Sequence, residues 1–252
     1  MRCYCGLGEP QQKAAAFIPK ISPNTIVFPP GTDSAMTSTA AQTPEWVTRG
    51  YQQEMLEESL RSNIIIALDT GAGKTHIAIL RMKMEAEREA KKVRDVHLDD
   101  PCPALQAYTK KISWFLAPTV TLCEQQKSVI GASLPVSVGY ISGSTEPTQW
   151  KNPVIWQNVL ETHRVMVSTP QVLLDALRHG YIVMGRDINL IVFDEAHHAT
   201  RDHPYNQIMK EFYFFLPTRA ASVVYDSSLV RPMIMGLTAS PIYGGNAAIA
   251  FK

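Results

Sequence analysis

Apolar residues along this chain gather in short runs, and the segments between these runs carry apolar positions at helical spacing. The runs are too short for helices and several are rich in β-branched residues, so we expect buried strands. They predict strands at residues 64–68, 112–116, 136–141, 165–167, 190–193 and 233–237. The other segments predict helices that begin near residues 48 and 74 and that cover residues 120–130, 153–160, 171–177 and 206–215. Such alternation favours an α/β fold, a mostly parallel sheet with helices on both faces.

The long helix that begins near residue 74 carries charged residues at i,i+3 and i,i+4 spacing. Side chains at these spacings are neighbours on a helix and can form ion pairs. The pairs are Arg81 with Glu85, Glu87 with Lys91, and Glu89 with Lys92. A charge pattern of this kind is typical of a solvated face, so we predict that this end of the helix is exposed.

A glycine-spaced loop follows the first predicted strand and ends in a lysine and a threonine. Its glycines allow successive backbone N–H groups to converge on phosphate oxygens, where a Cβ would crowd the anion. Lys74 can place its charge on the phosphates, and the Thr75 hydroxyl can ligate Mg²⁺. The predicted phosphate loop comprises Leu68, Asp69, Thr70, Gly71, Ala72, Gly73, Lys74 and Thr75. Leu68 stands where the usual pattern has a glycine, and a glycine-rich turn before an ordinary helix is the alternative.

An acidic pair, Asp194 and Glu195, follows the predicted strand at residues 190–193. A nucleotide site needs one carboxylate to hold Mg²⁺, usually through water, and a base to orient the attacking water. Asp194 would face the metal and Glu195 would polarise the water. An acidic turn at a strand end is the alternative, which the phosphate loop upstream disfavours.

Two histidines, His197 and His198, come directly after the acidic pair. Adjacent residues on a turn point in different directions, and no Cys or His lies at ligand spacing, so zinc binding is not expected. The hydroxyls of Thr238 and Ser240 can hydrogen-bond to His197 or to the acidic pair. We therefore predict that His197 links the acidic pair to the end of the last strand.

The composition, 45% hydrophobic and 19% charged over 252 residues, is that of a globular protein with a large core. A net charge of +1 provides no overall field that would attract nucleic acid or membrane. The four cysteines form no CxxC pair and no apolar run is long enough to span a membrane, so we expect an intracellular protein, cytoplasmic or nuclear. Residues 1–43, rich in Pro, Ser and Thr, are expected to be a disordered leader before a globular domain at 44–252.

Six short motifs occur in an order that resembles the first RecA-like lobe of superfamily 2 helicases, over about residues 44–241. They are Arg-Gly-Tyr-Gln at 49–52, Thr-Gly-Ala-Gly-Lys-Thr at 70–75, Ala-Pro-Thr at 117–119, Ser-Thr-Pro at 168–170, Asp-Glu-Ala-His at 194–197 and Thr-Ala-Ser at 238–240. Within the superfamily, three of the segments look like the Dicer branch, which includes innate-immune RNA sensors, and most of all like fungal Dicer-like proteins. Ala196 stands where that branch often has Cys.

The resemblance implies a RecA-like P-loop NTPase lobe that binds ATP and Mg²⁺. Arg49 and Gln52, which by themselves would pass for a surface arginine and a helix-start glutamine, would then read adenine. Lys74 and Thr75 would hold phosphate and Mg²⁺. The implied catalytic residues are Lys74, Asp194, Glu195 and His197, with Thr75 and Asp194 at the metal.

The resemblance also implies contacts with double-stranded RNA. Pro118, Thr119, Thr169 and Pro170 match family positions near the RNA backbone, where loops and helix N-termini can donate to phosphates. Thr238 and Ser240 match the motif that couples hydrolysis to movement.

We therefore expect the ATP-binding lobe of a Dicer-like RNA helicase, which serves small-RNA production and antiviral silencing. The second RecA-like lobe and the nuclease domains of a Dicer are not present in 252 residues, so we expect a truncated chain that hydrolyses ATP slowly or not at all. One alternative is a nucleotide-dependent binding module without turnover. Another is a DNA-directed helicase or translocase, because no motif here reads the 2′-hydroxyl.

Overall fold

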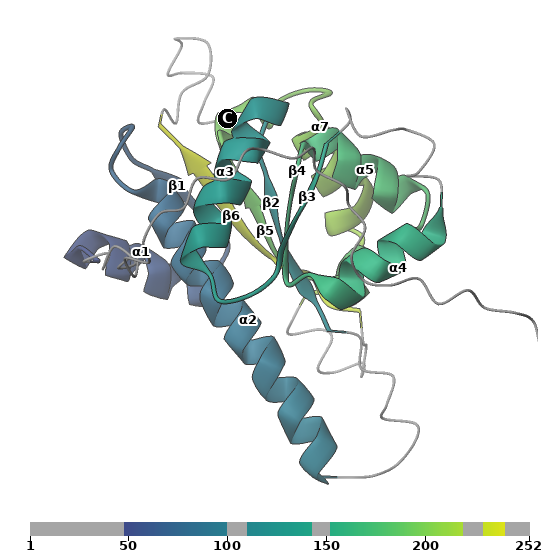
Figure 1. The fold of residues 1–252 in the computed structure, drawn as a ribbon. Helices are drawn as coiled ribbons and strands as arrows, with labels where there is room; N and C mark the ends of the chain where they lie inside the picture. The colour runs from purple at the N-terminus through teal and green to yellow at the C-terminus, as the bar shows by residue number, and fades with distance from the viewer. Residues whose placement is uncertain (1–47, 100–109, 143–151, 219–228, 240–252) are drawn as a thin grey trace, which may run out of the picture. The chain divides into compact units, whose positions relative to one another are not determined.

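The computed structural model describes residues 48–99, 110–142, 152–218 and 229–239 (Figure 1). The predicted leader at residues 1–43 lies outside these ranges. Within them no helix is both long and apolar enough to cross a membrane.

The described strands form one sheet of six parallel strands. They are β1 (Ile64–Ala67), β2 (Ile112–Leu116), β3 (Val138–Ile141), β4 (Val165–Ser168), β5 (Ile188–Phe193) and β6 (Met233–Thr238). Their order across the sheet is β1-β6-β5-β2-β4-β3, so the last described strand lies between the first and the fifth. Because all six run the same way, their carboxyl ends meet along one side, which we call the carboxyl edge.

Helices cover both faces of this sheet (Figure 1). The helices are α1 (Gly50–Arg61), α2 (Lys74–Asp99), α3 (Val120–Ser133), α4 (Pro153–Thr162), α5 (Pro170–Arg178), α6 (Met184–Asp187) and α7 (Pro204–Ile208). Residues of α1, α2 and α3 pack on one face, and residues of α4, α5 and α7 pack on the other. The predicted α/β fold with two helical layers is confirmed.

Strand β2 shows why the runs are mostly apolar. Trp114 packs into the core on one side of the sheet, and its neighbour Phe115 packs into the core on the other. Successive side chains of a strand point to opposite faces, so a strand covered on both faces is apolar at most positions. The polar exception in β2 is Ser113, whose buried hydroxyl donates to Asn189 Oδ1 at 2.8 Å. All five residues of β2 are buried.

The helix predicted at 206–215 begins two residues earlier, with Pro204 in its first turn, and it continues as a π-helical turn at Met209–Tyr213. The short helix α6 was not predicted, because four residues carry no helical periodicity. The other predicted helices and strands are present within a few residues of their expected bounds.

The prediction that the charged end of α2 is exposed is wrong for three residues, since Arg81, Glu85 and Glu89 are buried. Arg81 pairs with Glu85, and its Nε donates to Ser59 O at 3.3 Å. Glu87 and Lys91 are exposed as expected. The charged residues of α2 therefore include three that face inward, of which Arg81 contacts α1.

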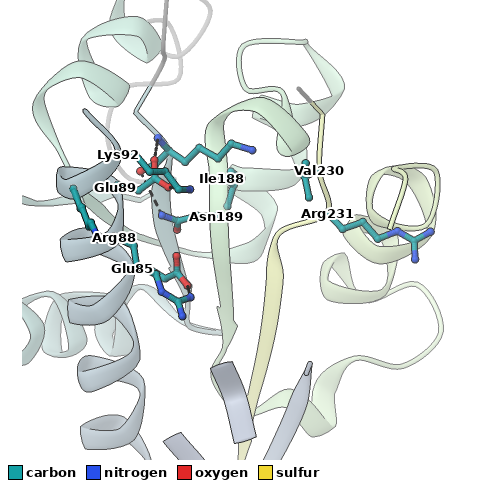
Figure 2. Close-up of a pocket in the computed structure, with 10 residues that line it drawn as sticks. Glu85, Arg88, Glu89, Lys92, Ile188, Asn189, Val230 and Arg231 are labelled. Carbon is teal, nitrogen blue, oxygen red and sulfur yellow. Dashed lines mark hydrogen bonds and ion pairs between the residues drawn. The ribbon is translucent and has the colours of Figure 1, made fainter. Parts of the chain in front are cut away.

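A hollow of about 510 Å³ lies beside α2 at the amino ends of β2 and β5 (Figure 2). Its charged side chains bond within the protein: Arg88 to Glu85 at 3.1 Å, and Lys92 to Glu89 at 2.7 Å. Lys111 Nζ donates to Gly185 O at 2.6 Å. The backbone N–H of Lys111, the residue before β2, donates to Glu89 Oε2 at 3.2 Å, which ties α2 to the sheet at the end opposite the carboxyl edge.

Candidate active site

The carboxyl edge gathers the predicted site residues that the structure describes. The phosphate loop follows β1, Asp194 follows β5, and Thr238 ends β6, which lies between these two strands. Two further loops extend the edge, since Pro118 and Thr119 follow β2, and Thr169 follows β4. Residues from five strand ends therefore lie along one side of the sheet, and Ser240 lies outside the described residues.

The phosphate loop is anchored to α1. Tyr51 Oη donates to Ala72 O at 2.8 Å, and Gln52 Nε2 donates to the same oxygen at 3.1 Å. Gln52 is buried, and its Oε1 accepts from the backbone N–H of Arg49, whose side chain is exposed. The first turn of α1 thus holds the loop that follows β1, and the exposed Arg49 donates from Nη1 to Tyr51 Oη at 3.2 Å.

The two glycines of the loop adopt conformations that other residues avoid. The φ angles of Gly71 and Gly73 are 82° and 85°, in the left-handed region. A Cβ built on Gly73 would lie 2.3 Å from Gln52 Nε2. Glycine is therefore required at position 73 both by the backbone and by the neighbouring side chain.

Lys74 contacts the loop's own carbonyl groups. Its Nζ donates to Leu68 O at 2.8 Å and to Asp69 O at 3.2 Å. Thr75, half-buried, follows in the first turn of α2. A bound phosphate would exchange neutral carbonyl partners of Lys74 for a charged one, and charge-assisted hydrogen bonds are the stronger kind. Asp69 and Thr70 are exposed.

The acidic pair lies where β5 ends. Asp194 is 8% exposed, and burial followed by the charge of Glu195 raises its pKa to about 6. The charge of Lys74 acts in the opposite direction on this pKa. Asp194 Oδ1 accepts from the Glu195 backbone N–H at 3.1 Å.

Glu195 has a φ of 48° and a ψ of 51°, the left-handed conformation. Such a backbone is strained for a residue with a Cβ, and strained residues of this kind concentrate at functional sites. The turn directs the chain from β5 into the 3₁₀ turn at Ala196–His198.

His197 links the acidic pair to β6. Its Nδ1 lies 3.0 Å from Thr238 Oγ1 and 3.3 Å from Glu195 Oε2. Burial, and next the neighbouring His198, lower the pKa of His197, and Glu195 opposes this shift. A neutral imidazole between a hydroxyl and a carboxylate suits the linking role assigned to it from sequence.

Two residues that the sequence analysis missed hold Asp194 in place. Gln126 on α3 has its Nε2 at 3.5 Å from Asp194 Oδ2. The buried Tyr205 has its hydroxyl at 2.8 Å from Asp194 O and 3.0 Å from Leu116 O, which ties the ends of β5 and β2 together. No sequence signal pointed to Tyr205, whereas Gln126 lies three residues after the apolar Cys123 and so shares its face of α3.

The residues present fit a hydrated Mg²⁺. Asp194 and Thr75 provide carboxylate and hydroxyl oxygens, which are the ligand types that Mg²⁺ prefers. Gln126 Oε1 is buried and has no hydrogen-bond partner among the described residues. An acceptor of this kind beside a carboxylate suits the water that Mg²⁺ keeps when it binds.

The loops after β2 and β4 begin helices at the same edge. Thr119 is exposed, and its side chain accepts from Leu122 N at 3.3 Å as the N-cap of α3. Pro118 and Thr169 are half-buried, but Pro170 is buried in the first turn of α5. Contact with a ligand at this corner would therefore involve Thr169 in preference to Pro170.

Comparison with known proteins assigns this arrangement to a family. The family model described as DEAD/DEAH box helicase matches residues 49–243. Its matched range begins at Arg49 and includes the phosphate loop, the acidic pair and Thr238.

Curated relatives with high similarity are fungal proteins. The chain is 44% identical over 210 residues to Dicer-like protein 2 of Coccidioides immitis, covering 83% of this chain and 13% of the relative. It is 42% identical over 195 residues to Dicer-like protein 2 of Cryphonectria parasitica, covering 77% of this chain and 12% of that relative. The chain therefore spans about an eighth of the length of these relatives.

A solved structure has the same fold. The crystal structure of the Pyrococcus furiosus Hef helicase domain matches with a TM-score of 0.54 and 28% identity, over 79% of this chain and 34% of that one.

Proposed function

The chain belongs to the DEAD/DEAH box helicase family, and from this premise we propose that it is the ATP-binding lobe of a Dicer-like RNA helicase. In this role the lobe couples ATP hydrolysis to binding of, and movement along, double-stranded RNA. The process it serves is small-RNA production and antiviral silencing. Support for the RNA substrate comes from the likeness to Dicer-like protein 2 of several fungi.

The observation that carries the ATPase proposal is the convergence of Lys74 and the acidic pair at one edge of the sheet. Lys74 holds the phosphates, and the backbone N–H groups of Gly71 to Thr75 surround them. Arg49 contacts adenine from the start of α1, and Gln52 contacts it by exchanging its present partners, Ala72 O and the Arg49 backbone N–H. Mg²⁺, when bound at Thr75 and Asp194, supplies the positive charge that neutralises the transferred phosphoryl group.

Glu195 orients the attacking water and accepts its proton. The left-handed backbone at Glu195, which is strained for a residue with a Cβ, supports a functional role for this residue. Its partner His197 contacts Thr238, so a change at the γ-phosphate is transmitted to the end of β6. Pro118, Thr119, Thr169 and Pro170 form the corner nearest to the RNA backbone, with Thr119 the most exposed of them.

The test is a lobe exchange combined with a point substitution. Residues 44–252 replace the equivalent lobe of Dicer-like protein 2 from Cryphonectria parasitica, and ATP hydrolysis is measured with duplex RNA, with duplex DNA and alone. We expect RNA to stimulate hydrolysis, and Glu195→Gln to lower kcat by about 100-fold or more while ATP affinity changes little.

Glu54→Gln, which changes an exposed carboxylate on α1, is the matched control and is expected to leave kcat unaltered. Equal activity of the Glu195→Gln and Glu54→Gln proteins would contradict the catalytic assignment. Stimulation by duplex DNA in preference to RNA would favour a DNA translocase. ATP binding without any turnover would favour a nucleotide-dependent binding module.

A further inference from the structure

Helix α3 carries an amide side chain to the buried carboxylate of the site. The helix begins after Thr119, and Cys123 and Ile130 on its inner face are buried in the core. Gln126 lies between them at helical spacing, half-buried, with Nε2 at 3.5 Å from Asp194 Oδ2. Gln125, the preceding residue, is exposed.

The other end of this amide is the unusual feature. Gln126 Oε1 is buried and has no hydrogen-bond partner within the described part of the chain. An unsatisfied buried acceptor costs about 1–3 kcal/mol, and such groups are rare in folded proteins. Rotating the amide by half a turn would not satisfy this acceptor. It would place Oε1 against the Asp194 carboxylate oxygen, and these two acceptors would repel each other.

Hydrated Mg²⁺ would supply the missing donor. The ion keeps several of its waters when a protein binds it, and each water it polarises is a strong hydrogen-bond donor. Groups that do not touch a metal but hold its ligands and waters commonly tune its affinity. An amide presents both functions at once, because one end donates to the carboxylate and the other accepts from water.

We propose that Gln126 is a positioning residue of the magnesium site, whose Nε2 orients Asp194 and whose Oε1 accepts a hydrogen bond from a metal-bound water. This inference rests on the proposed function, since it requires Mg²⁺ at Asp194. It assigns a role in nucleotide binding to a residue on α3 outside the sequence motifs.

The experiment measures binding of a non-hydrolysable ATP analogue to the full chain by calorimetry, over a magnesium chloride titration and in excess EDTA. Gln126→Met removes both amide functions at nearly constant volume, and Gln125→Met is the matched control. We expect Gln126→Met to raise the Mg²⁺ concentration for half-maximal enhancement of binding by about 10- to 100-fold. Affinity in EDTA is expected to stay within twofold of the original chain.

Gln126→Glu distinguishes the donor function of the amide nitrogen from the acceptor function of the amide oxygen. It keeps an acceptor oxygen but places a second negative charge beside Asp194, so we expect a lower Tm without magnesium and a larger rise in Tm on adding magnesium than for the original chain. This variant also tests the proposal if Gln126→Met does not fold.

The outcomes separate this inference from the proposed function. Failure of the original chain to bind the analogue, with or without Mg²⁺, would overturn both. Normal binding by the original chain, with the same magnesium requirement in the Gln126→Met and Gln125→Met proteins, would overturn the inference alone. An equal loss of affinity in EDTA and in magnesium would show a purely structural role for Gln126 and would overturn it as well.

Discussion

Single residues at the carboxyl edge are constrained by partners that are distant in sequence. Gly73 is needed not only for its φ of 85° but also because Gln52 lies where a Cβ would be. Asp194 is buried beside another carboxylate, an arrangement that opposes stability and that metal binding would relieve. The local Gly-x-Gly-Lys-Thr pattern was enough to predict a glycine-dependent turn before α2, whereas the Gln52 contact depends on how α1 packs.

Gly73→Ala provides a test at this scale. We expect the substitution to break the hydrogen bond from Gln52 to Ala72 O, to weaken binding of an ATP analogue by at least about tenfold, and to destabilise the chain by about 1–2 kcal/mol, the cost of a left-handed alanine. Calorimetry and thermal unfolding measure the two effects. Gly131→Ala, in α3 with open space around it, is the control and is expected to stabilise the chain slightly. Unchanged nucleotide binding by the Gly73→Ala protein would contradict this account of the loop.

At the scale of elements, the apolar pattern predicted which segments are strands and helices, but it did not predict which polar residues of α2 face inward. Charged residues at i,i+4 spacing give the same sequence pattern whether that side of the helix is exposed to solvent or buried against another element. Arg81 and Glu85 are buried because α2 packs between α1 and the sheet, and Arg81 Nε donates to Ser59 O on α1. The pair therefore belongs to the packing of two helices and not to the surface of one.

Substitution of the buried carboxylate on α2 tests this packing. We expect Glu85→Ala to lower the free energy of unfolding by about 3 kcal/mol or more, because Arg81 keeps its buried charge and loses its carboxylate partner. Glu87→Ala, two residues away and exposed, is expected to change it by less than about 0.5 kcal/mol. Urea unfolding followed by circular dichroism measures both. Equal effects of the two substitutions would argue against a buried pair.

At the scale of the whole molecule, the two helical layers exclude solvent from the faces of the sheet and from side chains that pack against it. Cys123 is fully buried in the layer formed by α1, α2 and α3, and its Sγ lies 3.5 Å from Ala117 O. Burial, opposed by the hydrogen bond with Ala117 O and aided by the charge of Asp194, raises the pKa of the Cys123 thiol to about 11. The reactive thiolate is therefore scarce at neutral pH in the folded chain.

Labelling of Cys123 provides a test at this scale. We expect iodoacetamide at pH 8 to leave Cys123 unmodified in the folded chain and to modify it in denaturant, with the Cys123 peptide followed by mass spectrometry. Raising the pH from 8 to 9.5 is expected to increase the slow labelling of the folded chain by about tenfold per pH unit, since both values lie below the raised pKa of the thiol and the thiolate fraction grows with pH there. Magnesium with an ATP analogue is expected to slow the residual labelling by stabilising the folded state. Rapid modification of the folded chain at pH 8 would contradict the burial.

The sequence by itself determined the elements and the loops that carry the predicted chemistry. Run length, periodicity and the order of the motifs are local properties, so the strands, the phosphate loop and the acidic pair could be predicted from residues near in the chain. The tertiary structure alone decided that β6 lies between β1 and β5, and that Gln126 and Tyr205 contact Asp194. These relations join residues far apart in sequence, and which of them meet depends on strand order and helix packing, which no local pattern records.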